Sequence, residues 1–198
     1  MLLYLARHGQ SEANVQRIFA NTGQKYGLTD LGHTQAEQLA ERMAVRPIQA
    51  IYSSPILRAV QTAEIVSKRI RVPVEIQPAL REFDVGEWEG KTDPRGWQEH
   101  RNTMQAWLVE NRLDARMQGG ESWHDIEARF IPFVDRLVQS ASLHSAYLLI
   151  GHGGTFLSML PRLTRDITPQ QAFETSYPNT AIITLEWQGN AFHLISME

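Results

Sequence analysis

The sequence predicts an α/β fold: a single-domain three-layer α/β/α sandwich, with a mostly parallel sheet, an antiparallel edge and a helical insertion over the site. Short apolar runs alternate with segments whose apolar residues recur at helical spacing, which is typical of βα units and a covered parallel sheet. The last two apolar runs are separated only by 188–190, which favours an antiparallel closing pair. We see no repeat or linker in the 198 residues, so we expect one domain over 1–198, with 78–120 as a lid-like insertion.

The first part of the chain contains three predicted strands and two predicted helices. Apolar runs without helical period indicate buried strands. Thr29 is the expected N-cap of the first helix, and Pro47 stops that helix. The remaining elements are a strand over 2–6, a strand over 50–52, a helix over 57–70 and a strand over 72–76.

The second part contains the insertion, three predicted helices and three predicted strands. In the insertion we expect a helix over 97–109, and Gly119-Gly120 ends the region. A long amphipathic helix follows, and Pro132 within it predicts a kink or a break. The elements after the insertion are a helix over 122–140, a strand over 146–150, a helix over 155–163 and closing strands over 181–187 and 192–196.

Composition narrows the classes of function. The formal net charge of -3 favours neither nucleic acid nor an anionic membrane surface as a partner. The absence of cysteine excludes disulfides, thiolate nucleophiles and cysteine-based zinc sites. The N-terminal apolar run is too short for a signal peptide, and no apolar stretch approaches the roughly 20 residues that span a bilayer. We therefore expect a cytoplasmic protein. No spacing typical of a metal site occurs among five of the histidines, namely His33, His100, His124, His144 and His193.

Polar residues stand directly after the predicted strands. Arg7 and His8 follow the first strand, Ser54 and Arg58 follow the second, and His152 follows the fourth. In open α/β sheets, ligands bind at the carboxyl ends of the strands. If these strands are neighbours, two histidines and two arginines meet at one edge of the sheet.

An ordered set of motifs resembles the histidine phosphatase superfamily, which includes cofactor-dependent phosphoglycerate mutase. The motifs occur in the order of that family and cover nearly the whole chain. They are Arg7-His8-Gly9-Gln10-Ser11-Glu12-Ala13-Asn14, Leu28-Thr29-Asp30-Leu31-Gly32-His33-Thr34-Gln35-Ala36, the run 52–63, the run 80–90, Gly119-Gly120-Glu121-Ser122 and Gly151-His152-Gly153-Gly154.

The resemblance implies catalytic roles for five residues. His8 would attack phosphorus and become a phosphohistidine. Arg7, Arg58 and His152 would bind the equatorial phosphoryl oxygens. Glu82 would protonate the leaving oxygen and then act as a base toward the water that cleaves the phosphoenzyme.

The resemblance also implies how substrate is held. Asn14 would add a neutral donor to the phosphoryl group, and Thr22 with Gly23 would lend a further hydroxyl or backbone donor, although a plain turn there is as acceptable. The implied partner is a small-molecule phosphoester, handled by a histidine acid-type phosphatase that needs no cofactor and no metal. We expect a monomer or a homodimer.

Physical chemistry supports these residue types independently of the resemblance. Phosphoryl transfer spreads negative charge over three oxygens, so positioning and positive electrostatics dominate. Arginine supplies charge in a fixed fork geometry. A neutral imidazole attacks directly, and nearby cations favour that neutral form by depressing the pKa of His8.

Two alternatives stay open. A phosphoglycerate mutase shares the phosphohistidine, but in mutases a His- and Tyr-containing stretch and a longer basic insertion follow the acidic residue. Here 83–90 and His152-Gly153-Gly154 resemble the phosphatase branch. A non-catalytic phospho-ligand binding module is the second alternative, although both nucleophile and acid are retained. The substrate stays open, and the arginines in or beside the insertion are candidates for a second acidic group.

Overall fold

The computed structural model describes residues 1–142 and 144–198, and these residues form one six-stranded sheet in the order β3-β2-β4-β1-β5-β6. Strands β3, β2, β4 and β1 are parallel, β5 is antiparallel to β1, and β6 is antiparallel to β5. The predicted mostly parallel sheet with an antiparallel edge is therefore confirmed. The strands are β1 (Leu2–Arg7), β2 (Ala50–Ser53), β3 (Val74–Ile76), β4 (Ala146–Gly151), β5 (Ile182–Trp187) and β6 (Phe192–Met197).

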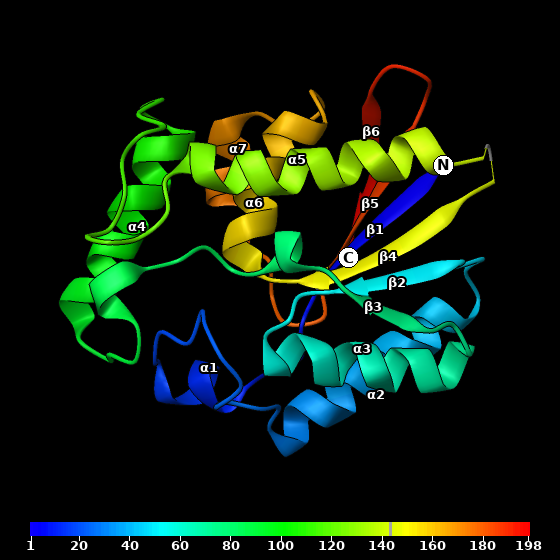
Figure 1. The fold of residues 1–198 in the computed structure, drawn as a ribbon, viewed down its shortest axis with the longest axis horizontal. Helices are drawn as coiled ribbons and strands as arrows, with labels where there is room; N and C mark the ends of the chain where they lie inside the picture. The colour runs from blue at the N-terminus through cyan, green and yellow to red at the C-terminus, as the bar shows by residue number, and fades with distance from the viewer. Residues whose placement is uncertain (143) are drawn as a thin grey trace.

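Helices cover both faces of the sheet, which confirms the predicted three layers. Figure 1 shows α2 and α3 on one face, and α5, α6 and α7 on the other. Each face has its own cluster of buried apolar side chains, with Leu39 and Val66 in one and Phe130 and Phe156 in the other. The helices are α1 (Glu12–Gln16), α2 (Asp30–Ala44), α3 (Leu57–Ile70), α4 (Pro94–Leu108), α5 (Trp123–Ser140), α6 (Gly153–Leu163) and α7 (Pro169–Glu174), with 3-10 turns at Pro78–Leu80 and Gly86–Trp88.

Some elements differ from the predictions, most clearly α4 and β3 in their boundaries and α1 and α7 in their presence. Helix α4 begins at Pro94, earlier than expected, because the Asp93 carboxylate accepts the backbone N–H of Arg95 and caps the helix. Strand β3 begins only at Val74, after a proline that cannot donate to the ladder. Helices α1 and α7 were not predicted, because five or six residues are too few to show a helical period.

The sequence predicted a kink or a break at Pro132, and the break is wrong because α5 continues through Pro132 from Trp123 to Ser140. A proline inside a helix costs about 3 kcal/mol. Burial of Ile126, Phe130 and Phe133 on the sheet offsets that cost, because each fully buried side chain of this size contributes about 1.5–3 kcal/mol.

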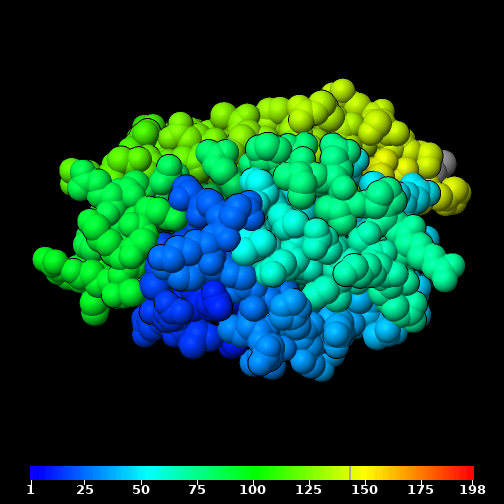
Figure 2. Space-filling model, turned by 60° about the horizontal axis from the view of Figure 1, so that its bottom comes forward, coloured from blue at the N-terminus to red at the C-terminus, as the bar shows by residue number. Residues whose placement is uncertain are grey.

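The insertion stands at the end of the sheet where the parallel strands finish. Figure 1 shows α4 beyond the carboxyl ends of β1 and β4, next to the loop that carries α1. In Figure 2, the blue N-terminal segment lies between the green insertion and the cyan segment that includes α3. Three stretches far apart in sequence therefore surround this edge of the sheet. In the described ranges, no helix has both the length and the apolar character needed to cross a bilayer.

Candidate active site

A cavity of about 290 Å³ opens at the carboxyl end of the sheet. Its wall includes five residues that the sequence singled out, namely Arg7, His8, Asn14, Arg58 and Glu82. The first two end strand β1 and enter the loop after it, Arg58 lies in the first turn of α3, and Glu82 follows the 3-10 turn after β3. The crossovers of the sheet thus bring these side chains together.

The backbone at His8 is held against helix α2. A Cβ on Gly9 would lie 2.5 Å from the Gly32 carbonyl oxygen, so only glycine permits this close approach. The Gly9 N–H donates to Thr62 Oγ1 at 3.1 Å, which ties the loop to α3 as well. The nucleophile candidate therefore sits on a rigid loop that is fixed from two sides.

The hydrogen bonds of His8 identify its tautomer. Nδ1 lies 2.6 Å from the Gly9 carbonyl oxygen, and a carbonyl only accepts, so Nδ1 carries the proton. Nε2 accepts from Arg58 Nε at 3.0 Å, so its lone pair is unprotonated. Burial, with the charges of Arg58 and then Arg7, holds the pKa of His8 well below its usual range. The neutral, nucleophilic imidazole is the stable form in this site.

Arg58 is the hub of the cavity floor. Besides His8 Nε2, its guanidinium donates to the Ala20 carbonyl at 2.5 Å and to His152 Nδ1 at 3.3 Å. Burial is the main reason that its pKa falls to about 10. Arg58 therefore stays protonated at neutral pH and supplies a fixed positive charge beside the His8 lone pair.

The Arg7 guanidinium has one anchored donor and, among the described residues, one unpaired donor. One terminal nitrogen donates to the Tyr177 carbonyl at 2.6 Å, which anchors the guanidinium. Its Nε is buried and has no hydrogen-bond partner among the described residues. A buried donor without a partner costs about 1–3 kcal/mol, so an anion that occupies the cavity would recover this energy.

His152 lies behind His8 and does not form part of the cavity wall. The two rings are 5.1 Å apart, and His152 is fully buried. Its Nδ1 accepts from Arg58, so Nε2 carries the proton and donates to Ser54 Oγ at 2.8 Å. Both ring nitrogens are thus occupied. The implied direct contact of His152 with phosphoryl oxygens stays a prediction, and the polar contacts that the structure gives His152 are with Arg58 and Ser54.

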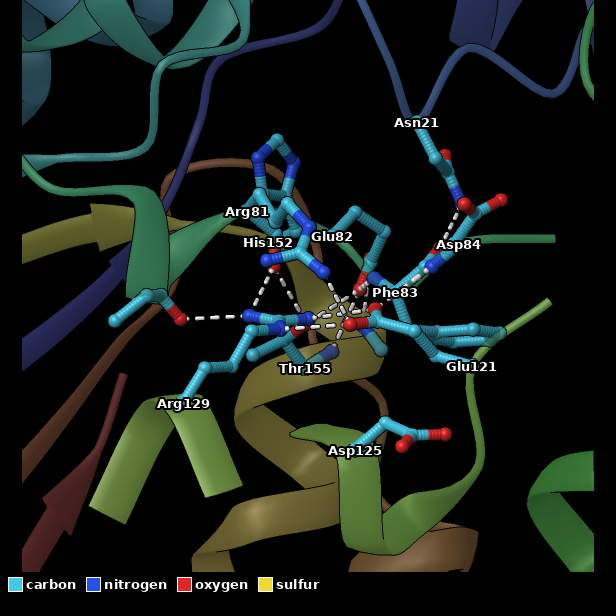
Figure 3. Close-up of polar contacts among 12 residues, drawn as sticks. Asn21, Arg81, Glu82, Phe83, Asp84, Glu121, Asp125, Arg129, His152 and Thr155 are labelled. Atoms are coloured by element: carbon cyan, nitrogen blue, oxygen red, sulfur yellow. Dashed lines mark hydrogen bonds and ion pairs between the residues drawn. The ribbon is translucent and has the colours of Figure 1, made fainter. Parts of the chain in front are cut away.

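Glu82 is fixed by the start of helix α6. Its Oε1 accepts from the Phe83 N–H and from both the N–H and the hydroxyl of Thr155. Among the described residues, Oε2 accepts only from the Gly154 N–H, at 2.9 Å. Figure 3 shows Thr155 beside the Glu82 carboxylate. Oε2 therefore retains capacity for one further hydrogen bond.

An ion-pair network supports the segment that carries Glu82. Figure 3 shows Arg81 and Arg129 converging on the Glu121 carboxylate. Arg129 also donates to the carbonyls of Ala79 and Arg81, at 2.6 and 3.0 Å. The side chains of Arg129 and Glu121 are each 12% exposed. The backbone on the N-terminal side of Glu82 is thereby fastened to α5.

The remaining predicted substrate contacts divide into two groups. Asn14 lines the cavity, and its Oδ1 accepts from the Ser11 N–H in the cap of α1. Thr22 and Gly23 lie outside the cavity wall, and the Thr22 hydroxyl and N–H both donate to the Glu89 carboxylate. Asn21, which the sequence did not single out, lines the cavity in their place.

The sequence also did not reveal the residues that helix α4 contributes to the cavity wall. The sequence did not single out His100 as a site residue, yet His100 lines the cavity with Trp97 and Met104. These three residues share one face of α4, because spacings of three and four bring side chains together on a helix. That spacing was readable from the sequence, but the direction in which the face points was not.

No group of three or more His, Cys, Asp or Glu side chains that could hold a metal ion occurs within residues 1–142 and 144–198. The cavity combines a buried neutral histidine, one buried and one half-buried arginine, and a fixed carboxylate. This combination defines an anion-binding site with a nucleophile, in which the anion is a phosphoryl group or a group of similar shape.

Comparison with known proteins supplies the family. The sequence model of the histidine phosphatase superfamily (branch 1) matches residues 3–198. The chain belongs to this superfamily, as the motifs of the sequence indicated, and it is an enzyme of that class.

Relatives within the superfamily include phosphatases and a mutase. A putative phosphoserine phosphatase of Hydrogenobacter thermophilus is 31% identical over 193 residues, which cover 98% of this chain and 93% of the relative. A probable phosphoglycerate mutase of Proteus mirabilis is 33% identical over 157 residues, covering 76% and 69%. The solved structure of a mycobacterial glucosyl-3-phosphoglycerate phosphatase complexed with VO3 has a TM-score of 0.81 and 28% identity, covering 98% and 96%.

Proposed function

We propose that this protein hydrolyses a small phosphomonoester, without a metal, through a phosphohistidine intermediate on His8. The observation that carries the proposal is the Nδ1-protonated tautomer of His8, with its Nε2 lone pair directed at a buried arginine. Phosphatase relatives of high coverage support the reaction class. The cavity of about 290 Å³ supports a small substrate, since ligand pockets of about 300 Å³ hold small molecules.

In the first step, His8 Nε2 attacks phosphorus and the bond from phosphorus to the ester oxygen breaks. Arg58 must exchange its bond to Nε2 for a bond to a phosphoryl oxygen, which frees the lone pair as charge arrives. Arg7 Nε supplies a second charged donor, and Asn14 a neutral one. Glu82 delivers a proton from Oε2 to the departing alkoxide oxygen, a role worth about 10²–10⁴-fold in rate.

In the second step, the same carboxylate removes a proton from water as the water oxygen attacks phosphorus. The bond from phosphorus to Nε2 breaks, His8 returns to its neutral form, and inorganic phosphate leaves. We assign His152 the task of orienting Arg58 in both steps, because its two ring nitrogens join Arg58 to Ser54. His152 thereby acts through the arginine.

The probable phosphoglycerate mutase of Proteus mirabilis supports the mutase alternative, whereas the charges of the cavity wall oppose it. A phosphoglycerate carries a carboxylate besides its phosphate, and a buried carboxylate needs a positive partner. The arginines of the described cavity wall are Arg7 and Arg58, and both are required for the phosphoryl group. We therefore favour hydrolysis, and include the acid-type assignment in the proposal.

The test is hydrolysis of p-nitrophenyl phosphate in the presence of EDTA, combined with trapping of an acid-labile, alkali-stable phosphoryl label. Wild type should turn over and trap label. His8→Ala should trap none and lose at least about 10⁴-fold in kcat, as expected for loss of a nucleophile. His33→Ala is the matched control, because His33 is exposed on α2.

Two outcomes would overturn the proposal: dependence of turnover on added metal, and full activity of His8→Ala. Incubation with 3-phosphoglycerate, scored for free phosphate and for isomerised product, separates hydrolysis from mutase activity. Isomerisation without phosphate release would replace our proposal by the mutase alternative.

A further inference from the structure

Besides Arg7, His8 and the other polar groups already described, the cavity is lined largely by apolar and aromatic side chains. These side chains come from the loop after α1, from α4 and from α6, and they are Ile18, Phe19, Trp97, His100, Met104 and Leu157. We call this set the far wall. The leaving group of a phosphoester bound to His8 would rest against it.

The far wall is packed tightly before any ligand binds. Phe19 stacks on Trp97 with ring centroids 4.0 Å apart, and Phe83 stacks on His100 at 4.9 Å. A Cβ on Gly96 would lie within 3.0 Å of Phe19, so α4 is seated closely on this cluster. A preorganised apolar surface binds an apolar group without a cost of ordering side chains.

The arginines in or beside the insertion do not line the cavity. Each of the five candidates for a second acidic group lies outside the cavity wall and has a partner elsewhere. Arg81 pairs with Glu121, Arg95 with Asp93, Arg112 with Glu110 and Arg116 with Asp125, while Arg101 lies over the Phe173 ring. In the part of the chain that the structure describes, the far wall therefore contains no arginine or lysine.

His100 is the polar member of the far wall. Its ring has no hydrogen-bond partner among the described residues, although it lies against Phe83 and faces the cavity. Burial lowers the pKa of His100, so at neutral pH the ring is uncharged and offers one donor and one acceptor. It suits a hydroxyl or ring heteroatom of a ligand better than an anionic group.

We propose that the far wall is a leaving-group subsite for an uncharged, apolar or aromatic alcohol, with His100 as its polar contact, and that it disfavours substrates carrying a second negative charge. This inference rests on the proposed phosphatase function and narrows its substrate class. An unpaired carboxylate would have to lose its water against Phe19 and Trp97, whereas a flat ring would replace water there.

The test compares benzyl phosphate with 3-phosphoglycerate, because both release an alkyl alcohol and so need similar help from Glu82. We expect kcat/KM for benzyl phosphate to be higher by about 100-fold, which lies within the range for discrimination by an apolar pocket. Equal values, or a preference for 3-phosphoglycerate, would overturn the proposal.

A pair of neighbouring substitutions on α4 gives the matched control. Trp97→Arg places a cation on the far wall and should shift the ratio of kcat/KM toward 3-phosphoglycerate by at least about tenfold. Gln98→Arg adds the same charge at an exposed position one residue away and should leave the ratio unchanged. Leu157→Arg repeats the test from α6 if the first variant does not fold. An unchanged ratio in every folded far-wall variant would contradict the subsite.

Failure of this inference is distinguishable from failure of the proposed function. If His8 does not act as nucleophile, wild type traps no label from p-nitrophenyl phosphate, whatever the ratio of kcat/KM between the two substrates. If only the subsite is wrong, wild type still traps label on His8, but benzyl phosphate has no advantage.

Discussion

Replacing Gly154 with alanine adds one methyl group beside the Glu82 carboxylate. The new Cβ would lie 2.8 Å from Glu82 Oε1 and 2.6 Å from Phe83 Cε1, both closer than such contacts occur in proteins. Gly154 is helical, so the backbone accepts alanine, and the gain in helix propensity is about 0.5–1 kcal/mol. Overpacking costs about 1–3 kcal/mol, so the variant should fold with a small loss of stability.

The effect on catalysis should exceed the effect on folding. Glu82 has to move away from the added methyl group, and a displacement approaching 1 Å at a reacting group costs about 100-fold in rate. We expect kcat/KM for benzyl phosphate to fall by about that factor. The loss for p-nitrophenyl phosphate should be smaller, because nitrophenolate leaves without needing a proton.

The assay measures both substrates with Gly154→Ala and with Glu82→Gln, together with inhibition by inorganic phosphate. The two variants should share the substrate-dependent pattern, and the inhibition constant for phosphate should stay within about threefold, because the arginine donors are untouched. Wild-type kcat/KM for benzyl phosphate in Gly154→Ala would refute the reasoning, as would an equal loss for both substrates.

Two further predictions concern stability. Arg129→Met removes a buried partner of Glu121 and should lower the free energy of unfolding by about 3 kcal/mol, or the thermal midpoint by roughly 6–12 °C. The control is Arg112→Met at an exposed position, which should leave the midpoint near that of wild type. A midpoint near wild type in Arg129→Met would contradict the prediction. His8, His152 and His100 have depressed pKa values and are neutral in the folded protein. Below pH 6.5, the ordinary pKa of histidine, the unfolded chain binds more protons than the folded chain, so the free energy of unfolding decreases as the pH is lowered. Urea unfolding should show a loss of about 1 kcal/mol per histidine between pH 7.5 and 5.5, and a flat profile in phosphate-free buffer would contradict it.

Much of the site was readable from local pattern. Arg7, His8 and Arg58 stand directly after predicted strands, and parallel strands deliver such residues to one edge of the sheet. Glu82 was accessible only through the resemblance, because it follows no strand directly and Asp84 lies close to it in sequence. The structure separates the two, since Glu82 binds the start of α6 while Asp84 caps the turn at Gly86.

The sequence by itself determined the alternation of strands and helices, the order of the family motifs and the residue types at the strand ends, because these depend on neighbours along the chain. Only the tertiary structure decided that His8 carries its proton on Nδ1, that His152 contacts Arg58, and that His100 faces the cavity. The physical reason is that the tautomer of a histidine is set by its hydrogen-bond partners, which can lie far away along the chain. Arg58 is 50 residues from His8 and 94 residues from His152. The direction of a helix face likewise depends on what the helix packs against.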